Sequence, residues 1–213
     1  MRPLTDSDFW VTTSGPSGLA SANCYLADAD GHVCLIDPGF TFSLNPVARA
    51  LHAAGRSPYD VTDILLTHYD SDHAQIAAEW QRRTNAQVWM GDADADILSR
   101  IFPPPTPTRR TMAAFIGIPP LPGNLHRIIG ETEILPGIRA VPTPGHTPGH
   151  IAYVHGPVAY IGDAALVGMD GYLRPSPAFL MTNVTQGDKT REEIATWDVE
   201  WFASGHSAPA RRA

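Results

Sequence analysis

The stretch Ile64-Leu65-Leu66-Thr67-His68-Tyr69-Asp70-Ser71-Asp72-His73 decides the fold of this chain. Its aliphatic run predicts a short buried strand. Four side chains of metal-ligand type then follow at spacings i, i+2, i+4 and i+5, and these are His68, Asp70, Asp72 and His73. A loop with this spacing can aim its ligands at two neighbouring points. The stretch therefore predicts a buried strand that delivers ligands to a metal site at its end.

Three further clusters of ligand type follow a predicted strand or sit at a tight turn. They are Thr143 to His150 (TPGHTPGH), Gly162-Asp163 and Gly205-His206. Imidazole and carboxylate groups bind Zn, Fe or Mn at about 2.0–2.2 Å. Glycines beside His146, Asp163 and His206 allow the backbone to turn sharply and approach a buried centre. One histidine alone would most often be structural, but four such clusters predict a shared metal centre.

The rest of the chain alternates strands with helices. The predicted strands are 23–27, 33–36, 64–66, 87–90, one near Ile134, 138–141, 151–154, 159–161 and 199–203. Asn45-Pro46 predicts an N-cap with a first-turn proline, and Gly55 a helix stop. Further helices are expected from about Ala74, over 95–101, and from a T-x-x-E capping box at Thr190 and Glu193 through Trp197. This order predicts an α/β layered sandwich with its chemistry on one rim.

The segment from Phe102 to Asn124 is rich in proline, including Pro103-Pro104-Pro105 and Pro119-Pro120. Proline fixes φ and removes a donor, so a long regular element is not expected there. The segment is interpreted as a loop or short-helix insert over the site, with a plain surface excursion as the alternative. With 213 residues, the chain fits one domain, 1–213, that includes this insert.

Charge and composition exclude several classes of partner. Fifteen basic and 22 acidic residues give a net charge of −7, which argues against nucleic acid or an anionic membrane as the main partner. No apolar run approaches the roughly 20 residues of a membrane span, and Met1 to Asp6 lack a secretory signal pattern. Cys24 and Cys34 flank a predicted hairpin turn at Asp30-Gly31, where Cys34 falls opposite Ala27, so no disulfide is expected. We therefore expect a cytoplasmic protein that acts on a small-molecule substrate.

The motif set resembles the metallo-β-lactamase superfamily. Asp37-Pro38-Gly39 is similar to its first motif, 68–73 to its H-x-H-x-D-H motif, His146 to the third-motif ligand, Asp163 to the bridging aspartate, and His206 to the last histidine. The stretch 143–153, TPGHTPGHIAY, is similar to the glyoxalase-II-like branch. The resemblance implies an αββα sandwich, a dinuclear centre at the rim of the two sheets, and hydrolytic chemistry.

The resemblance also implies a ligand for each position. His68, Asp70 and His146 would form the first metal position. Asp72, His73 and His206 would form the second, and Asp163 would bridge the two. Asp37 and His150 would orient ligands or contact substrate, although Asp37 beside Pro-Gly also suits a turn.

The chain departs from the family pattern at position 70, where it carries Asp instead of histidine. The motif is thus H-x-D-x-D-H, and flavodiiron proteins carry a carboxylate at this place. Two divalent ions, three aspartates and a bridging hydroxide sum to zero charge, whereas a histidine at 70 would leave one positive charge. The lower charge should favour Mn²⁺ or Fe³⁺ over a softer ion, although Zn is the commonest metal in such sites. Asp70 would either ligate or only accept a hydrogen bond.

The expected activity is a metal-dependent hydrolysis of a small ester, thioester or lactone. The metals would lower the pKa of a bridging water from 15.7 toward about 7, and Asp72 would orient the hydroxide and move its proton. Glyoxalase II proteins carry a further C-terminal substrate domain, whereas seven residues follow His206 here, which argues against the glutathione thioester. The alternative is a non-haem iron oxidoreductase of the diiron or persulfide-dioxygenase type. In persulfide dioxygenases, which resemble this scaffold, two histidines and an aspartate hold one iron, and His68, His146 and Asp163 match those positions. A non-catalytic binding module would be expected to lack ligands, and only position 70 departs.

Overall fold

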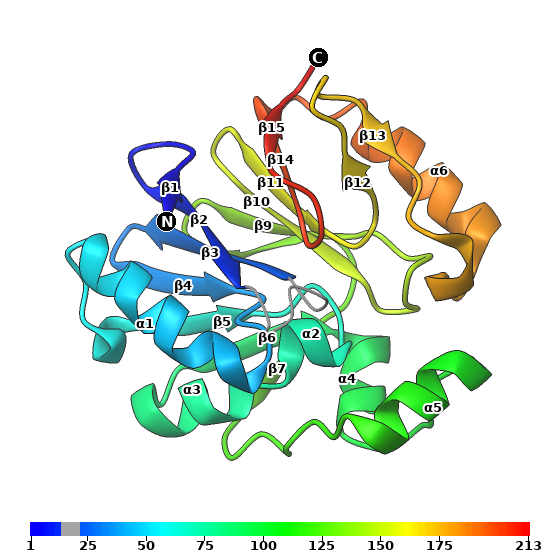
Figure 1. The fold of residues 1–213 in the computed structure, drawn as a ribbon, viewed down its shortest axis with the longest axis horizontal. Coiled ribbons are helices and arrows are strands. Elements are labelled where there is room, and N and C mark those ends of the chain that lie inside the picture. The colour runs from blue at the N-terminus through cyan, green and yellow to red at the C-terminus, as the bar shows by residue number, and fades with distance from the viewer. Residues whose placement is uncertain (14–21) are drawn as a thin grey trace.

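Two large β-sheets lie face to face with helices outside them, as the computed structural model shows for residues 1–13 and 22–213 (Figure 1). Helices α1 to α4 lie against the outer face of one sheet, and α6 lies outside the other. The predicted α/β class and αββα sandwich are confirmed.

The first sheet has seven strands in sequence order. Its first four strands pair antiparallel, and the pairs from the fourth to the seventh are parallel. The strands are β1 (Arg2–Pro3), β2 (Asp8–Thr13), β3 (Ala22–Ala29), β4 (His32–Ile36), β5 (Asp63–Leu65), β6 (Gln87–Gly91) and β7 (Leu125–Ile128).

The second sheet has six strands in the order β15-β14-β11-β10-β9-β8. Its members are β8 (Thr132–Leu135), β9 (Ile138–Pro142), β10 (Ile151–His155), β11 (Val158–Gly162), β14 (Trp201–Ser204) and β15 (Ala210–Arg211). The strands β11 and β14 run parallel, so Asp163 and Gly205-His206 leave the sheet at the same edge. A small separate ladder joins β12 (Leu166–Val167) to β13 (Leu173–Arg174).

Six α-helices and three short 3-10 helices complete the described part of the chain. The α-helices are α1 (Leu44–Ala53), α2 (Ser71–Ala74), α3 (Ala77–Thr84), α4 (Asp92–Leu98), α5 (Pro107–Phe115) and α6 (Val184–Ile194). The 3-10 helices are Thr41–Ser43, Pro58–Asp60 and Ala178–Leu180. Helix α5 lies inside the proline-rich segment, where Thr106 caps it and Pro107 occupies its first turn.

Two helix starts differ from the sequence prediction. The helix α1 begins at Leu44 after a 3-10 turn, so Ser43 and not Asn45 is its N-cap, although it stops before Gly55 as expected. The helix expected from Ala74 is instead two helices, because α2 begins at Ser71 within the ligand motif and α3 begins at Ala77. Helix α4 lies three positions before the predicted range 95–101. Strand β14 begins two positions later and ends one position later than the predicted range 199–203.

The predicted capping box at Thr190 and Glu193 is wrong. Helix α6 begins at Val184, and the Asn183 side chain accepts a hydrogen bond from the backbone of Gln186. Thr190 lies in the last turns of α6 and donates its hydroxyl to the Pro144 carbonyl over 2.7 Å. The threonine therefore ties α6 to the 143–150 loop, and the helix ends at Ile194 before Trp197.

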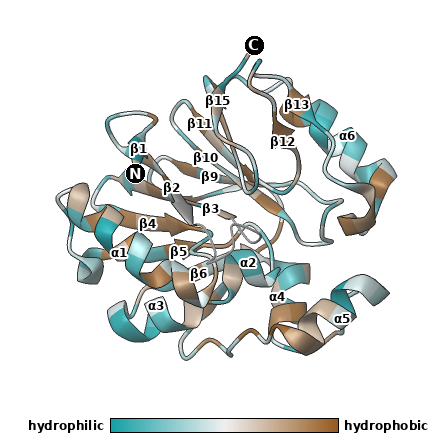
Figure 2. Cartoon of the chain, viewed as in Figure 1, coloured by the Kyte–Doolittle hydropathy of each residue, from teal (hydrophilic) through white to brown (hydrophobic). Residues whose placement is uncertain are grey.

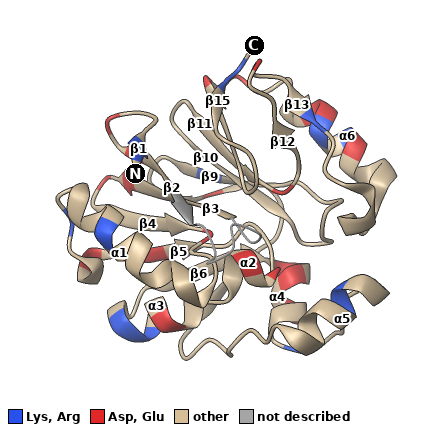
Figure 3. Ribbon diagram, viewed as in Figure 1, with Lys and Arg blue, Asp and Glu red and all other residues tan. Residues whose placement is uncertain are grey.

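Three apolar cores fill the layers of the sandwich. One lies between the sheets and includes Tyr25, Leu65, Tyr153 and Tyr160. The other two lie under the outer helices, one around Trp80 and one under α6. The inner strands are accordingly brown in Figure 2, whereas much of α3 and α6 is hydrophilic. Charged residues gather on these same outer helices (Figure 3).

The hairpin between β3 and β4 turns where the sequence predicts it. Asp30 and Gly31 both have positive φ, 45° and 89°, which suits a two-residue turn. Cys34 pairs with Ala27 in the ladder, and both cysteines are free and buried, as expected. No helix among residues 1–13 and 22–213 is both long and apolar enough to cross a lipid bilayer.

Candidate metal centre

Four loops bring ligand-type side chains together at one edge of the sandwich. The loop after β5 and the helix α2 that follows it carry His68 to His73, and the loop from β9 to β10 carries His146 and His150. Asp163 follows β11, and His206 follows β14. Strand ends that meet at one edge are thus the reason that residues far apart in sequence become neighbours.

One group of three ligand-type side chains consists of Asp72, His73 and His206. The His206 Nε2 atom lies 3.1 Å from Asp72 Oδ2 and 3.4 Å from His73 Nε2. The ring of His73 is fully buried, while Asp72 and His206 are partly exposed. This group matches the second metal position expected from the sequence, and it is open to solvent on one side.

A second group consists of His68, His146 and Asp163, all of which are buried. The Nε2 atom of His68 makes no hydrogen bond although it is buried. His146 Nε2 lies 3.5 Å from Asp163 Oδ2. A buried ring nitrogen without a hydrogen bond, close to a carboxylate, fits the role of a metal ligand.

The Asp163 carboxylate belongs to the second group and also faces the first. Its Oδ1 atom is 3.5 Å from His73 Nε2, and its Oδ2 atom is 3.3 Å from His206 Nε2. The same Oδ2 faces His146 of the other group. Asp163 is therefore placed as the sequence prediction for a bridging aspartate requires.

Asp37 forms hydrogen bonds to the candidate ligand His73 and to Thr67, which immediately precedes His68. It is buried, with a φ of 50°. Its Oδ2 atom accepts hydrogen bonds from His73 Nδ1 at 2.8 Å and from Thr67 Oγ1 at 2.6 Å, and Oδ1 accepts from the Thr67 amide. With Nδ1 donating to Asp37, His73 presents Nε2 to the centre.

His150 is buried behind the centre. Its Nδ1 atom is 2.8 Å from Thr143 Oγ1, and its Nε2 atom accepts from the Asp163 amide at 3.2 Å. The ring stacks on His68 with centroids 5.2 Å apart. Of the two roles expected for His150, its contacts favour orientation of the ligands over contact with substrate.

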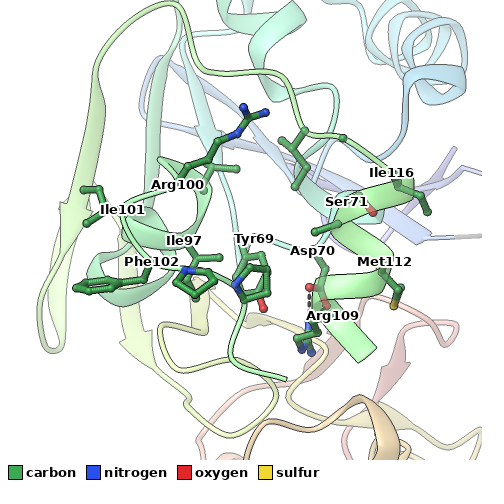
Figure 4. A pocket seen from close by; sticks show the side chains of 16 residues that line it. Tyr69, Asp70, Ser71, Ile97, Arg100, Ile101, Phe102, Arg109, Met112 and Ile116 are labelled. Atoms are coloured by element: carbon green, nitrogen blue, oxygen red, sulfur yellow. Dashed lines mark hydrogen bonds and ion pairs between the residues drawn. The ribbon is translucent and has the colours of Figure 1, made fainter. Parts of the chain in front are cut away.

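Asp70 lies near the first group but is engaged elsewhere. Its Oδ2 atom is 3.4 Å from His68 Nε2 and 3.2 Å from His146 Nε2. Both carboxylate oxygens also contact Arg109 Nη1 (Figure 4). Among the described residues, Asp70 belongs to none of the groups of three ligand-type side chains. Arg109 lies on α5. Sequence reasoning missed it because the residues around it have the pattern of an ordinary exposed helix.

Asp94 is a second residue that the sequence reasoning missed. It is buried near the start of α4 and accepts hydrogen bonds from Tyr69 N, Thr147 Oγ1 and Gly149 N. Burial raises the pKa of Asp94 to about 6, although the bonds to Thr147 and Gly149 oppose this. Asp94 fastens the two loops that carry His68 and His146. The acidic run Asp92-Ala93-Asp94 after a strand was the available signal.

The electrostatic environment of the centre stabilises positively charged groups. Burial alone would lower the pKa of His73 and of His206, but the carboxylates outweigh it. Asp163 and Asp37 raise the pKa of His73 to about 9. Asp163 and Asp72 raise the pKa of His206 to about 11. Burial opposes ionisation of Asp163, yet His73 and His206 hold its pKa well below the usual value.

The donor set and the space fit metal ions. Imidazole nitrogens and carboxylate oxygens are the ligands that Zn, Fe and Mn share. A Cβ atom on Gly205 would come within 2.3 Å of Asp163 Oδ1 and 2.5 Å of His73 Cε1, so only glycine leaves this approach open. The expected ligands His68, Asp72, His73, His146, Asp163 and His206 are thus brought together.

An apolar pocket of about 410 Å³ adjoins the centre. Its lining comes from the end of α4, from α5 and from the proline-rich segment between them, and Figure 4 shows Ile97, Phe102, Met112 and Ile116 around it. Asp70 and Arg109 form its polar end. The insert therefore lies beside the predicted centre and supplies a cavity of a size that small ligands use.

Comparison with known proteins shows to which family this chain is related. A family model described as the metallo-beta-lactamase superfamily matches residues 17–206. The protein YobT of Bacillus subtilis (strain 168), described as uncharacterized, is 28% identical over 97% of this chain and 91% of its own length. A hydroxyacylglutathione hydrolase of Fuscovulum blasticum is 33% identical over 68% of this chain. The chain spans only about half, 48%, of that hydrolase.

A solved structure extends the likeness to the fold. The structure of TTHA1623 in a di-iron-bound form superposes with a TM-score of 0.71 at 21% identity. The match covers 95% of this chain and 94% of that one.

Proposed function

Because the chain belongs to the metallo-beta-lactamase superfamily, we propose that it is a metal-dependent hydrolase with two neighbouring metal positions and a small ester, thioester or lactone as substrate. The observation that carries the proposal is the position of Asp163, whose carboxylate faces His73 and His206 of one ligand group and His146 of the other. Asp72, His73 and His206 would hold one ion, and His68 and His146 the other. Zn²⁺ is the first candidate, and Fe or Mn are the alternatives.

Metal ions bound there would polarise a substrate carbonyl and make water more acidic. The residues of the chain supply the rest. Asp72 is the partly exposed carboxylate of the open group, where it can orient an attacking water and accept its proton. Asp37 and His150 fix the ligands, and the adjoining apolar pocket can hold the remainder of the substrate away from water.

The distant hydroxyacylglutathione hydrolases support thioester and ester hydrolysis as the reaction class. The test is hydrolysis of a panel of esters, thioesters and lactones by protein stripped with a chelator and then reloaded with Zn²⁺, Mn²⁺ or Fe²⁺. We expect turnover that depends on added metal and falls in Asp72→Ala. Turnover by the stripped protein equal to that of the loaded one would contradict the proposal.

One observation favours a second candidate. His68, His146 and Asp163 form a buried group of two histidines and one carboxylate, a set that suits a single non-haem iron. The corresponding activity would be oxidation of a persulfide by O₂. Oxygen uptake with a persulfide by iron-loaded protein, without ester or thioester hydrolysis, would favour this candidate over the hydrolase.

A further inference from the structure

Helix α5 buries one residue only, and that residue is charged. All the other residues from Pro107 to Phe115 are exposed, whereas Arg109 is 4% exposed. An arginine side chain loses hydration when it is buried, so it requires charged or hydrogen-bonding partners. The partners of Arg109 therefore show what α5 contributes to the molecule.

The guanidinium of Arg109 contacts groups that the first metal position would need. Nη1 contacts both oxygens of Asp70. Nη2 lies 3.0 Å from His146 Nε2, the ring nitrogen that faces Asp163. Arginine carries donors and no acceptor, so a hydrogen bond between the two requires that this nitrogen of His146 presents its lone pair to Arg109. The same lone pair is the one that a metal ion would bind.

Backbone contacts fix the guanidinium in this place. Nη2 also donates to the His146 carbonyl at 3.1 Å and to the Leu180 carbonyl at 2.6 Å. The guanidinium carbon lies 5.6 Å from the centre of the Tyr69 ring. Residues from three separate segments, Tyr69-Asp70, His146 and Leu180, thus hold Arg109, and Figure 4 shows its side chain running from α5 to Asp70. An arginine on the surface whose side chain merely bends inward would lack this set of contacts.

The charge of the centre leads to the same conclusion. Asp70, Asp72 and Asp163 bring three negative charges. Arg109 and a single divalent ion balance them, while a second divalent ion would leave two positive charges in excess until anions bind. The electrostatic repulsion between unit charges a few ångströms apart in a poorly solvated site is large.

We propose that Arg109 acts as a built-in cation at the first metal position and makes the two positions unequal. The centre binds one divalent ion tightly at Asp72, His73 and His206, with Asp163. A second ion binds at His68 and His146 only when the guanidinium is displaced, and Asp70 then becomes free to ligate. This inference rests on the proposed metal-dependent function, and it adds the order and strength of loading.

The experiment measures metal content and affinity, independently of activity. Wild type, Arg109→Ala and the matched control Arg110→Ala are stripped, loaded with Zn²⁺ and, in parallel, Mn²⁺, then analysed by elemental analysis and by titration against a chromophoric chelator. Arg110 lies on the same helix but is exposed and binds the Pro104 carbonyl. We expect one tight ion in wild type and in Arg110→Ala. We expect two in Arg109→Ala, with the second bound roughly 10- to 100-fold more tightly than in wild type.

The possible outcomes separate this inference from the proposed function. Two equally tight ions in wild type, or an unchanged second affinity in Arg109→Ala, would overturn the role of Arg109 and leave the hydrolase standing. No bound ion in any protein would overturn the metal centre itself and this inference with it. If Arg109→Ala does not fold by circular dichroism, Arg109→Gln removes the charge with less loss of volume, and the wild-type stoichiometry decides in any case.

Discussion

Asp37 and His73 share a buried hydrogen bond in which Nδ1 donates to Oδ2 over 2.8 Å. The bond fixes the ring so that its other nitrogen faces Asp163 and His206. Carboxylates in this position commonly raise the affinity of a histidine ligand for metal. The relationship makes Asp37 a residue that acts on the metal through its neighbour.

We expect Asp37→Asn to weaken Zn²⁺ binding by roughly 10- to 100-fold with the fold retained. Asparagine tolerates the positive φ of this position, so the backbone has no reason to change. The affinity is measured by competition with a chelator, and the fold by circular dichroism. Asp188→Asn is the control, because Asp188 is half-exposed on α6 and pairs with Arg191. Equal affinities in both variants would contradict the role assigned to Asp37.

Replacing the exposed carboxylate of the open group should remove catalysis. For Asp72→Ala we expect kcat to fall by roughly 10²- to 10⁴-fold, the range typical of a general acid or base, and His146→Ala should also lose turnover. Both variants should melt cooperatively, since neither side chain belongs to an apolar core. Wild-type kcat in either variant would exclude the assignment.

Asp94 should matter for stability as well as for the centre. Asp94→Ala leaves the Tyr69 amide, the Thr147 hydroxyl and the Gly149 amide without their acceptor. We expect the free energy of unfolding to fall by about 2–4 kcal/mol, measured by urea denaturation of the stripped protein. Asp96→Ala, on the same helix but bound to the half-exposed Arg127, should change it by less than about 1 kcal/mol. Similar losses in both variants would refute the prediction.

The pair of His155 and Asp8 should shape the pH dependence of stability. Their Nδ1 and Oδ1 atoms lie 2.8 Å apart. The bond to Asp8 raises the pKa of His155 above 6.5 despite its burial. Burial would raise the pKa of Asp8, but His155 and Thr5 lower it below 3.8.

Because the pKa of His155 is raised in the folded protein, its pairing with Asp8 contributes its full stabilisation at pH values below 6.5. This contribution is lost as the pH rises through the folded-state pKa of His155. Because the pKa of Asp8 is lowered in the folded protein, its carboxylate stabilises the fold at pH values above 3.8. This contribution is lost as the pH falls through the folded-state pKa of Asp8. We expect stability to peak between these limits. In His155→Gln, urea denaturation should show a weaker decline above pH 6.5, while His126→Gln, bound to the uncharged Gln87, should follow wild type. An unchanged decline in His155→Gln would contradict the assignment.

Sequence alone predicted the layers, most strands and the convergence of the ligand loops. It succeeded because buried strands leave clear apolar runs, and because the parallel neighbours β11 and β14 must deliver Asp163 and His206 to one edge. Helix ends were less predictable. The hydroxyl of Thr190 has the spacing of a capping residue, yet it bonds to Pro144, which is remote in sequence, and Asn183 caps α6 instead.

Sequence reasoning could not predict the partners of Asp70 or the hydrogen bonds by which Asp94 joins two loops. The identity of Asp70 suggested a ligand, but its behaviour depends on a guanidinium 39 positions away. Asp94 links residues 25 to 55 positions distant, and the acidic run that contains Asp94 does not indicate which residues it binds. Long-range contacts of single polar side chains leave no periodic trace.

Helix α5 carries two features on one short scaffold, namely a wall of the apolar pocket and the guanidinium at its polar end. The scaffold sits in an insert and not in either sheet. Natural variation or protein engineering that reshapes this insert to admit a larger ligand would therefore also change how many metal ions the adjacent centre holds, while the two sheets stayed unchanged.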